Sequence, residues 1–161
     1  MALLKYTTEV PVSRTVHEIF ELLRKAGADS IMLDYDKNKN PCGVSFITKT
    51  ANGSMSFRMD VDQEHVYQVL KNQYYKSIAP KAVLRDGQAA RVGWRIVGDW
   101  LAAQMALIEI GLVTLDQIFL PYAVNSEGQT VYKLLTQDGR MSRLLGTGAT
   151  QDSAQAPGKG A

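Results

Sequence analysis

Residue types that could carry out covalent chemistry are scarce in this chain of 161 residues. It contains one cysteine, Cys42, and two histidines, His17 and His65. A catalytic thiol needs a base such as histidine beside it. Cys42 follows a proline in an expected hairpin turn, whereas both histidines lie in expected helices. We therefore expect Cys42 to be a small structural residue, and a single cysteine excludes a disulfide within the chain.

Two stretches carry oxygen side chains at spacings that could bind a divalent cation. DYDKNKN (34–40) has the alternating oxygen ligands that begin a calcium-binding loop, but Lys39 stands where such a loop needs glycine and Ser45 where it needs glutamate. The second group comprises Asp60, Asp62, Glu64 and His65. Because carboxylates also favour the first turn of a helix, capping by Asp62 is favoured over a metal site.

Motifs for nucleotide or acyl-transfer chemistry are missing from the sequence. It has no GxxxxGK[ST], no GxGxxG that opens a helix and no GxSxG. The scattered carboxylates and two histidines form no recognisable catalytic constellation. An enzyme is therefore the least favoured interpretation, and no cofactor is expected.

Positive charge is concentrated in the middle of the chain, although the net charge is only +2. Residues 65–96 hold six basic side chains and one acidic side chain, whereas residues 1–64 sum to −1 and residues 97–161 to −2. Lysine and arginine bind phosphates without reading sequence, and aromatic rings stack on bases for about 1–3 kcal/mol each. The aromatic residues interleaved with these cations are Tyr67, Tyr74, Tyr75 and Trp94. This composition is typical of a protein that binds single-stranded nucleic acid.

The predicted nucleic-acid contacts combine this segment with one face of an expected sheet. The cations would neutralise phosphates, and two tyrosines would stack on bases. The predicted set is Lys71, Tyr74, Tyr75, Lys76, Lys81, Arg85, Arg91, Lys49 and Arg58. Two alternatives remain open: a surface for a protein partner, and a solvated helix end, because cations near a helix C-terminus are favourable by themselves.

Hydrophobic periodicity predicts the elements of the first half of the chain. Residues 4–10 alternate as in a short strand, and a helix follows with a capping box at Thr15 or a competing cap at Ser13, ending at Gly27. Three short alternating runs then predict a meander of strands, at 30–35, 43–50 and 55–61, with a type I′ turn at Asn52-Gly53. Alternation places Val44, Phe46, Phe57, Met59 and Val61 toward the helices, and Ile47, Lys49, Ser56 and Arg58 on the other face.

Two further helices are expected in the second half. Asp62 can cap a helix that ends near Tyr75, and a third helix begins near Gln88. From Gly93 to Leu112 this third helix is apolar nearly all round, so it must be covered on several sides. A central position and a subunit interface both explain such a helix. The residues expected to mediate self-association are Trp94, Val97, Trp100, Leu101, Met105 and Ile108.

The predicted fold is α+β, with a small antiparallel sheet in βαβββαα order packed by two or three helices, one of them long and apolar. Residues 1–136 are expected to form one domain and residues 137–161 a flexible tail, because the end of the chain lacks large apolar residues. No secretory signal or membrane-spanning stretch is evident, so we expect a cytoplasmic protein.

Several segments together resemble a group of small uncharacterised proteins from phage, prophage and metagenomic gene sets. The segments are YTTEVP (6–11), GVSF (43–46), RVGWRIVGDW (91–100), AQMA (103–106) and FLPY (119–122). The resemblance covers most of the chain except the tail, and it implies a genomic setting without any catalytic residue. In that setting such proteins are often replication or recombination accessories, or counter-defence factors.

We therefore expect a non-catalytic accessory protein of phage type that binds single-stranded nucleic acid, DNA first, and self-associates. The alternative is an interaction or counter-defence module that uses the same basic segment to bind a host protein or a small nucleotide. Neither mechanism breaks a bond.

Overall fold

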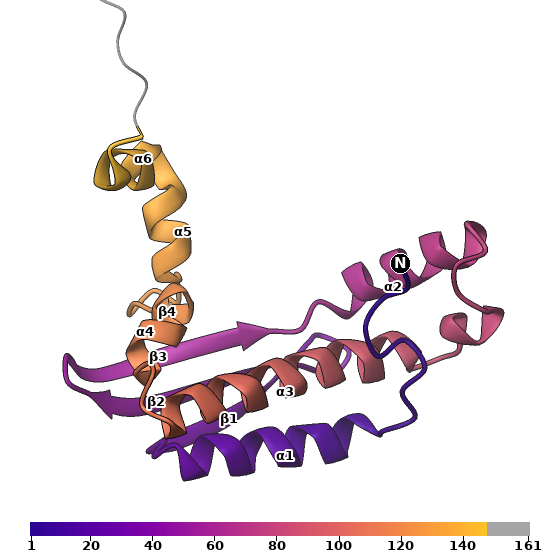
Figure 1. Cartoon of the computed structure of the whole chain (residues 1–161), viewed down its shortest axis with the longest axis horizontal. Coiled ribbons are helices and arrows are strands. Elements are labelled where there is room, and N and C mark those ends of the chain that lie inside the picture. The colour runs from indigo at the N-terminus through magenta and orange to yellow at the C-terminus, as the bar shows by residue number, and fades with distance from the viewer. Residues whose placement is uncertain (148–161) are drawn as a thin grey trace, which may run out of the picture.

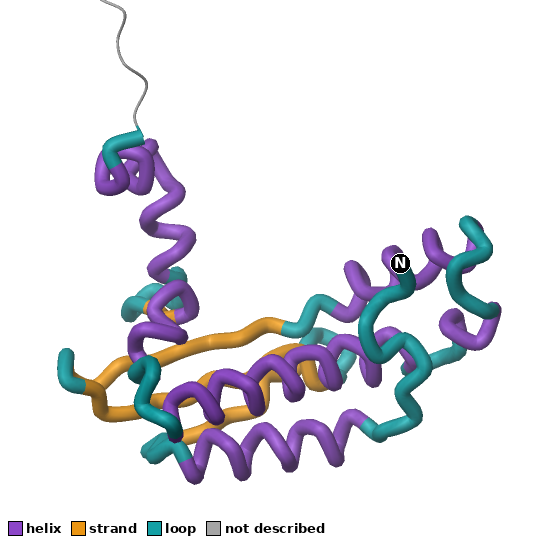
Figure 2. Tube along the Cα trace, in the orientation of Figure 1, coloured by secondary structure: helices purple, strands orange, loops and turns teal. Residues whose placement is uncertain are grey.

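The computed structural model describes residues 1–147, and residues 148–161, which belong to the predicted tail, lie outside the described part (Figures 1 and 2). The elements in chain order are α1 (Val12–Lys25), β1 (Ser30–Tyr35), β2 (Pro41–Thr50), β3 (Gly53–Asp60), α2 (Gln63–Tyr75), η1 (Lys81–Leu84), α3 (Gln88–Glu109), α4 (Leu115–Phe119), η2 (Leu120–Tyr122), β4 (Ala123–Val124), α5 (Val131–Thr136), η3 (Gln137–Gly139) and α6 (Arg140–Leu145). The strands form one antiparallel sheet in the order β1-β2-β3-β4. The α+β class and the three-strand meander are confirmed.

The N-terminal segment does not form the strand expected for residues 4–10. Lys5 has a φ of 60°, and the N–H groups of Tyr6 and Thr8 donate within tight turns. The carbonyls of Tyr6 and Thr8 accept instead from the side-chain amide of Gln88, at 2.9 and 3.1 Å. Backbone groups that a strand would pair are thus satisfied by turns and by α3, so the predicted βαβββαα order is wrong at its first element.

Helix α1 begins at Val12, with Pro11 as its N-cap, and not at the predicted capping box. Thr15 is buried inside the helix, and its hydroxyl has no hydrogen-bond partner. It faces Gly98 of α3, where an added Cβ would lie only 2.9 Å from Thr15 Cγ2. The absence of a side chain at Gly98 therefore allows α1 and α3 to pack closely. Helix α2 does begin as predicted, because the Asp62 carboxylate accepts from the N–H of His65 at 2.9 Å.

The turn between β2 and β3 differs from the predicted type I′ geometry. Thr50 pairs with Gly53 across the turn, so Ala51 and Asn52 are its central residues. Type I′ requires positive φ at both central residues. Here the positive φ falls on Gly53, at 102°, and not on Asn52. A glycine in this position is typical of a type I turn closed by a bulge.

One face of the sheet and the helices enclose the main core, as the alternation predicted. Phe46 and Phe57 stack with ring centroids 5.1 Å apart, and Phe119 of α4 packs edge-on against Phe46 at 5.3 Å. The buried residues of this core are Val16, Ile19, Leu23, Val44, Phe46, Phe57, Met59, Val61, Trp94, Leu101, Phe119 and Ala123. The opposite face of the sheet carries the partly or fully exposed Met32, Ile47 and Arg58. α1 and α3 thus cover one face of the sheet.

Helix α3 runs the length of the molecule and connects two projecting ends (Figure 1). One side of its C-terminal half is not covered by the chain among residues 1–147, because Ala102, Ala103, Ala106 and Glu109 are exposed. At its start it packs with α2 and η1 around a second buried cluster that contains Leu70 and Val83. At its other end the chain continues through β4 into α5 and α6, which project away from the sheet. Helical structure thus extends to Leu145, beyond the predicted domain boundary at residue 136.

None of the described helices combines the length and the hydropathy needed to cross a membrane.

Candidate nucleic-acid interface

The C-terminal half of α2 and the η1 turn form one projecting end of the molecule (Figure 1). We define the basic tip as Lys71, Tyr74, Tyr75, Lys76 and Lys81. The tip is held by burial of apolar side chains beneath it: Leu70, Ala79, Val83 and Val92. Ser77, with a φ of 56°, and Pro80 reverse the chain between α2 and η1. Five of the nine predicted contact residues thus lie on two neighbouring elements, α2 with its C-cap and η1.

The three lysines of the basic tip are available to bind an anion. Lys71, Lys76 and Lys81 form no ion pair with any described residue. The chain from His65 to Arg85 contains no aspartate or glutamate that could neutralise them. Lys76 is also the C-cap of α2, where the helix dipole favours a cation. That dipole accounts for one of the three lysines, which leaves a local excess of positive charge.

The two tyrosines of the tip differ in exposure. Their ring centroids lie 5.4 Å apart with the ring planes inclined by 52°. Tyr74 is half-buried and packs against the second cluster. Tyr75 is 69% exposed. Only Tyr75 therefore presents a free ring face of the kind that stacks on a base.

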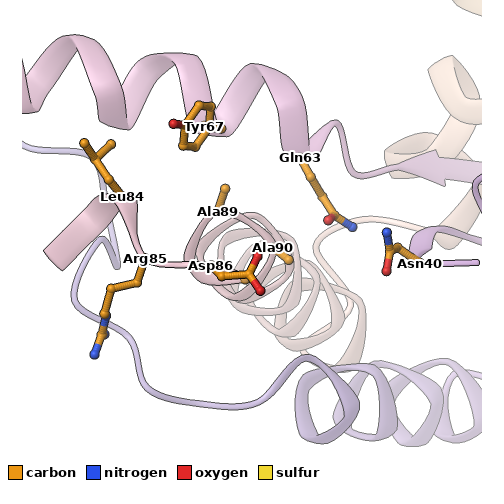
Figure 3. A pocket seen from close by; sticks show the side chains of 9 residues that line it. Asn40, Gln63, Tyr67, Leu84, Arg85, Asp86, Ala89 and Ala90 are labelled. Carbon is orange, nitrogen blue, oxygen red and sulfur yellow. The ribbon is translucent and has the colours of Figure 1, made fainter. Parts of the chain in front are cut away.

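A cleft of about 560 Å³ lies between α2, the start of α3 and the turn that joins β1 to β2 (Figure 3). The side chains of Asn40, Gln63 and Tyr67 surround it, and Asp86 adds a carboxylate at the start of α3. Arg85 directs its guanidinium away from Tyr67 and Gln63. The lining of the cleft also includes Arg85 and the apolar side chains of Leu84, Ala89 and Ala90, but none of the tip lysines. Sequence analysis did not predict it, because its walls come from three separate segments.

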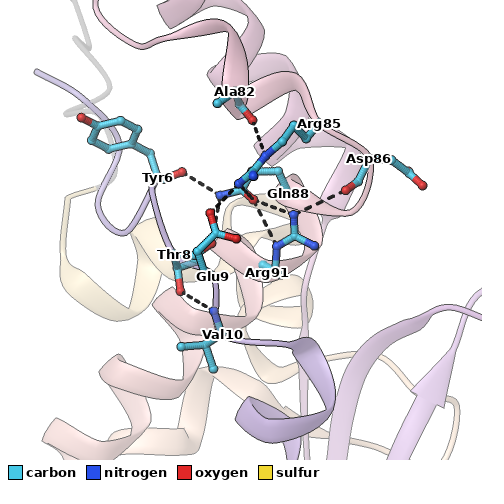
Figure 4. Close-up of polar contacts among 9 residues, drawn as sticks. All are labelled: Tyr6, Thr8, Glu9, Val10, Ala82, Arg85, Asp86, Gln88 and Arg91. Atoms are coloured by element: carbon cyan, nitrogen blue, oxygen red, sulfur yellow. Dashed lines mark hydrogen bonds and ion pairs between the residues drawn. The ribbon is translucent and has the colours of Figure 1, made fainter.

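Arg85 and Arg91, which were predicted to contact phosphates, form hydrogen bonds with other residues of the chain, although Arg85 lies at the surface (Figure 4). Arg85 donates to the Glu9 carboxylate at 2.5 Å and to the carbonyl of Ala82 at 3.1 Å. Arg91 donates to Gln88 Oε1 from two nitrogens, at 2.7 and 3.1 Å. The hydrogen bond from Arg85 lowers the pKa of Glu9, which keeps this carboxylate ionised. These guanidinium groups are therefore occupied by contacts within the chain.

Gln88 is the centre of this network and was missed by sequence analysis. Its side chain is 1% exposed. Its amide nitrogen donates to two carbonyls of the N-terminal segment, while its oxygen accepts from both arginines. Gln88 and Arg91 stand three residues apart on α3, a spacing that places side chains on one helix face, whereas Arg85 precedes the helix. That spacing was the signal that could have indicated a shared polar cluster.

Lys49 and Arg58 do not extend the basic tip. Lys49 lies one residue before the end of β2, and the β2–β3 turn and the C-terminal end of α2 lie at opposite ends of the molecule (Figure 1). Arg58 donates to Asp60 Oδ1 at 2.8 Å. The structure therefore places Lys49 away from the basic tip and pairs Arg58 with Asp60.

The candidate catalytic and metal-binding residues also have structural partners. Asp36 accepts from the N–H groups of Asn38 and Asn40 at 2.8 and 2.9 Å, which closes the β1–β2 turn. No group of three or more potential ligands that could hold a metal ion occurs among residues 1–147. Burial and then the carboxylate of Asp34 raise the pKa of the Cys42 thiol. A raised pKa disfavours the nucleophilic thiolate.

The residues predicted to mediate self-association fall into two groups. Trp94 and Leu101 are fully buried within the chain. Trp94 Nε1 also donates to the carbonyl of Pro41 at 3.2 Å. These two residues therefore belong to the core and cannot contact a second copy. The partly exposed members are Val97, Trp100, Met105 and Ile108.

No family model, curated protein or solved structure matches this chain. The resemblance to small phage and prophage proteins therefore stays a prediction.

Proposed function

We propose that this protein binds single-stranded nucleic acid, DNA first, through the basic tip and without strong sequence preference. The observation that carries the proposal is that three lysines, none of them ion-paired with a residue among 1–147, lie on the same projecting end of the molecule as the exposed ring of Tyr75. The lysines would neutralise consecutive phosphates and release their counterions. Tyr75 would stack on one base. No bond is formed or broken.

The proposal narrows the predicted contact set. Lys71, Tyr75, Lys76 and Lys81 remain as primary contacts. Tyr74 supports the ring of Tyr75, because their centroids are 5.4 Å apart. The engagement of Arg85, Arg91 and Arg58 in internal contacts removes them from the set.

The first experiment is an anisotropy titration of a fluorescent oligo(dT) strand at several salt concentrations between about 50 and 200 mM. Each phosphate contact on a single strand contributes about 0.7 to the slope of log affinity against log salt. Replacing Lys76 and Lys81 together by alanine should therefore lower the slope by about 1.4. The matched control replaces Lys49 and Lys133 by alanine. These substitutions remove the same charge at distant positions and should leave the slope nearly unchanged. Equal slopes for wild type and Lys76→Ala/Lys81→Ala would contradict the proposal, as would no binding at micromolar protein.

A second variant tests stacking separately from charge. Tyr75→Ala should weaken binding by about 1–3 kcal/mol without changing the salt slope. Tyr132→Ala removes another exposed tyrosine, on α5, and serves as the control. If both variants bind as tightly as the wild type, Tyr75 does not stack on a base.

A protein-interaction or counter-defence module is the second candidate function, and a separate observation favours it. Large apolar side chains are exposed along the C-terminal part of the described chain: Ile110, Leu112, Leu120, Tyr122, Tyr132, Leu144 and Leu145. Exposed apolar surface of this extent is typical of protein contact sites. Recovery of one stoichiometric host protein from nuclease-treated lysate would support this candidate, and loss of every bound protein after nuclease treatment would oppose it.

A further inference from the structure

The C-terminal arm, defined as α5, η3 and α6 (131–145), presents an apolar stripe that no residue among 1–147 buries. Met141, Leu144 and Leu145 have i, i+3 and i+4 spacing, which places them on one face of α6. Leu144 is 72% exposed and Leu145 is 68% exposed. Neither α5 nor α6 contains a buried residue. Helices of six residues are unstable in isolation, so the arm needs a surface on which to pack.

A groove of about 240 Å³ on the body of the molecule is suited to such a stripe. It lies between α3 and β3, and its lining residues are Met59, Asp60, Ile96, Val97, Trp100 and Tyr122. Strand β4 pairs only with Ser56 and Phe57, so the rest of the outer edge of β3 is left without a strand partner. The groove thus combines an apolar lining with one carboxylate.

The charges of the arm and the groove are complementary. Arg140 and Arg143 flank the apolar stripe of α6; Arg143 donates to the carbonyl of Asp138 at 3.0 Å, whereas the Arg140 side chain has no such contact among the described residues. Asp60 has a side chain that is 62% exposed. Its Oδ1 accepts from Arg58, and its Oδ2 has no ion-pair partner among the described residues. An amphipathic helix that lays its apolar face in this groove could therefore place an arginine beside Asp60.

We propose that two copies of this chain exchange their arms, so that α6 of each copy occupies the groove between α3 and β3 of the other. The exchange is reciprocal and closes as a twofold dimer, which leaves no arm unpaired. It does not rest on nucleic-acid binding. It also assigns Val97 and Trp100, two of the residues expected to mediate self-association, to a defined contact.

Sedimentation of the full chain tests the oligomeric state. At about 100 µM protein the wild type should sediment with twice the mass of the 17.8 kDa chain. Leu144→Asp/Leu145→Asp should sediment as a monomer that still unfolds cooperatively in urea, and its circular dichroism should lose no more than the helical signal of the arm. The matched control, Leu4→Asp/Met32→Asp, alters two residues that are also more than half exposed and should remain dimeric. A monomeric wild type, or a Leu144→Asp/Leu145→Asp variant that stays dimeric, overturns the proposal.

Cysteine cross-linking tests the position of the arm. In a Cys42→Ser background each molecule carries one new cysteine, either Tyr122→Cys at the groove or Leu144→Cys on α6. Every disulfide must then join two copies, and oxidation of the mixed variants should give the 122–144 link as the main product. The control mixture pairs Leu144→Cys with Met32→Cys on the open face of the sheet. Equal yields from the two mixtures would overturn the assignment of the arm to the groove.

Discussion

The contact between Thr15 on α1 and Gly98 on α3 sets how closely these helices approach. A Cβ added at Gly98 would lie 2.9 Å from Thr15 Cγ2, but 3.8 and 3.9 Å from Cγ1 and Cδ1 of Ile19. The optimal separation of two carbon atoms is about 3.5–4.0 Å. Gly98→Ala is therefore obstructed by one methyl group, and removal of that methyl group should relieve the obstruction.

This geometry predicts that the effect of Gly98→Ala depends on residue 15. In the wild type, overpacking should cost about 1–3 kcal/mol, and the better helix propensity of alanine should offset about 1 kcal/mol. The net change is then a loss of about 0–2 kcal/mol of unfolding free energy. In a Thr15→Ala background the obstruction is absent, so Gly98→Ala should stabilise the chain by about 1 kcal/mol. The two substitutions should therefore couple by about 1–3 kcal/mol.

Urea unfolding followed by tryptophan fluorescence measures all four corners of this cycle, because α3 carries Trp94 and Trp100. Thr15→Ala alone should cost little, since the Thr15 hydroxyl has no hydrogen-bond partner to lose. Additive effects of the two substitutions would refute the close approach of α1 and α3 at Gly98.

Two further contacts give measurable predictions. Gln88→Leu should lower the unfolding free energy by about 1–3 kcal/mol, because two carbonyls lose a buried donor, and an unchanged urea midpoint would contradict the structural role of Gln88. The hydrogen bond from Arg95 holds the pKa of Glu18 below its ordinary 4.5, so this pair stabilises the fold above the unfolded pKa and its contribution is lost as pH falls through the folded pKa. Glu18→Gln should therefore lose less stability than the wild type on acidification below about pH 4.5, and identical pH profiles would exclude the pair as a source of acid sensitivity.

Elements with local signals were predictable from the sequence. Asp62 marks the start of α2 because its carboxylate can reach an N–H group only three residues away. Period-two alternation identified the core face of the sheet, since one face is buried and the other open. These signals require no knowledge of distant residues.

The errors arose where the deciding partner is far away in the chain. The alternation over residues 4–10 resembles a strand, but its carbonyls meet Gln88, about 80 residues later. Charge counts treat every cation as free, whereas Arg85 meets Glu9 across 76 residues. Burial of Trp94 likewise depends on the sheet, and the pattern of apolar residues on one helix does not show which stripe the sheet covers. Local spacing therefore located the basic segment but could not separate its lysines, which have no ion pair among the described residues, from its hydrogen-bonded arginines.

The basic tip and the C-terminal arm lie at opposite ends of α3, so exchange of the arms would leave both basic tips of a dimer free to bind nucleic acid. An arm-exchanged dimer would carry two basic tips, so a long strand could bind both. The second contact would then be intramolecular, and avidity gains of about 10²–10⁴ are typical of such arrangements.

The preference for long strands therefore depends on the arm. The wild type should bind an oligo(dT) of about 60 nucleotides far more tightly than one of about 15, beyond the gain expected from additional sites. Leu144→Asp/Leu145→Asp should bind the short strand normally and lose the extra gain on the long one. Weaker binding of the short strand by this variant would mean that the arm itself contacts nucleic acid. An undiminished preference would mean that the two tips do not act together, because joint binding requires the dimer.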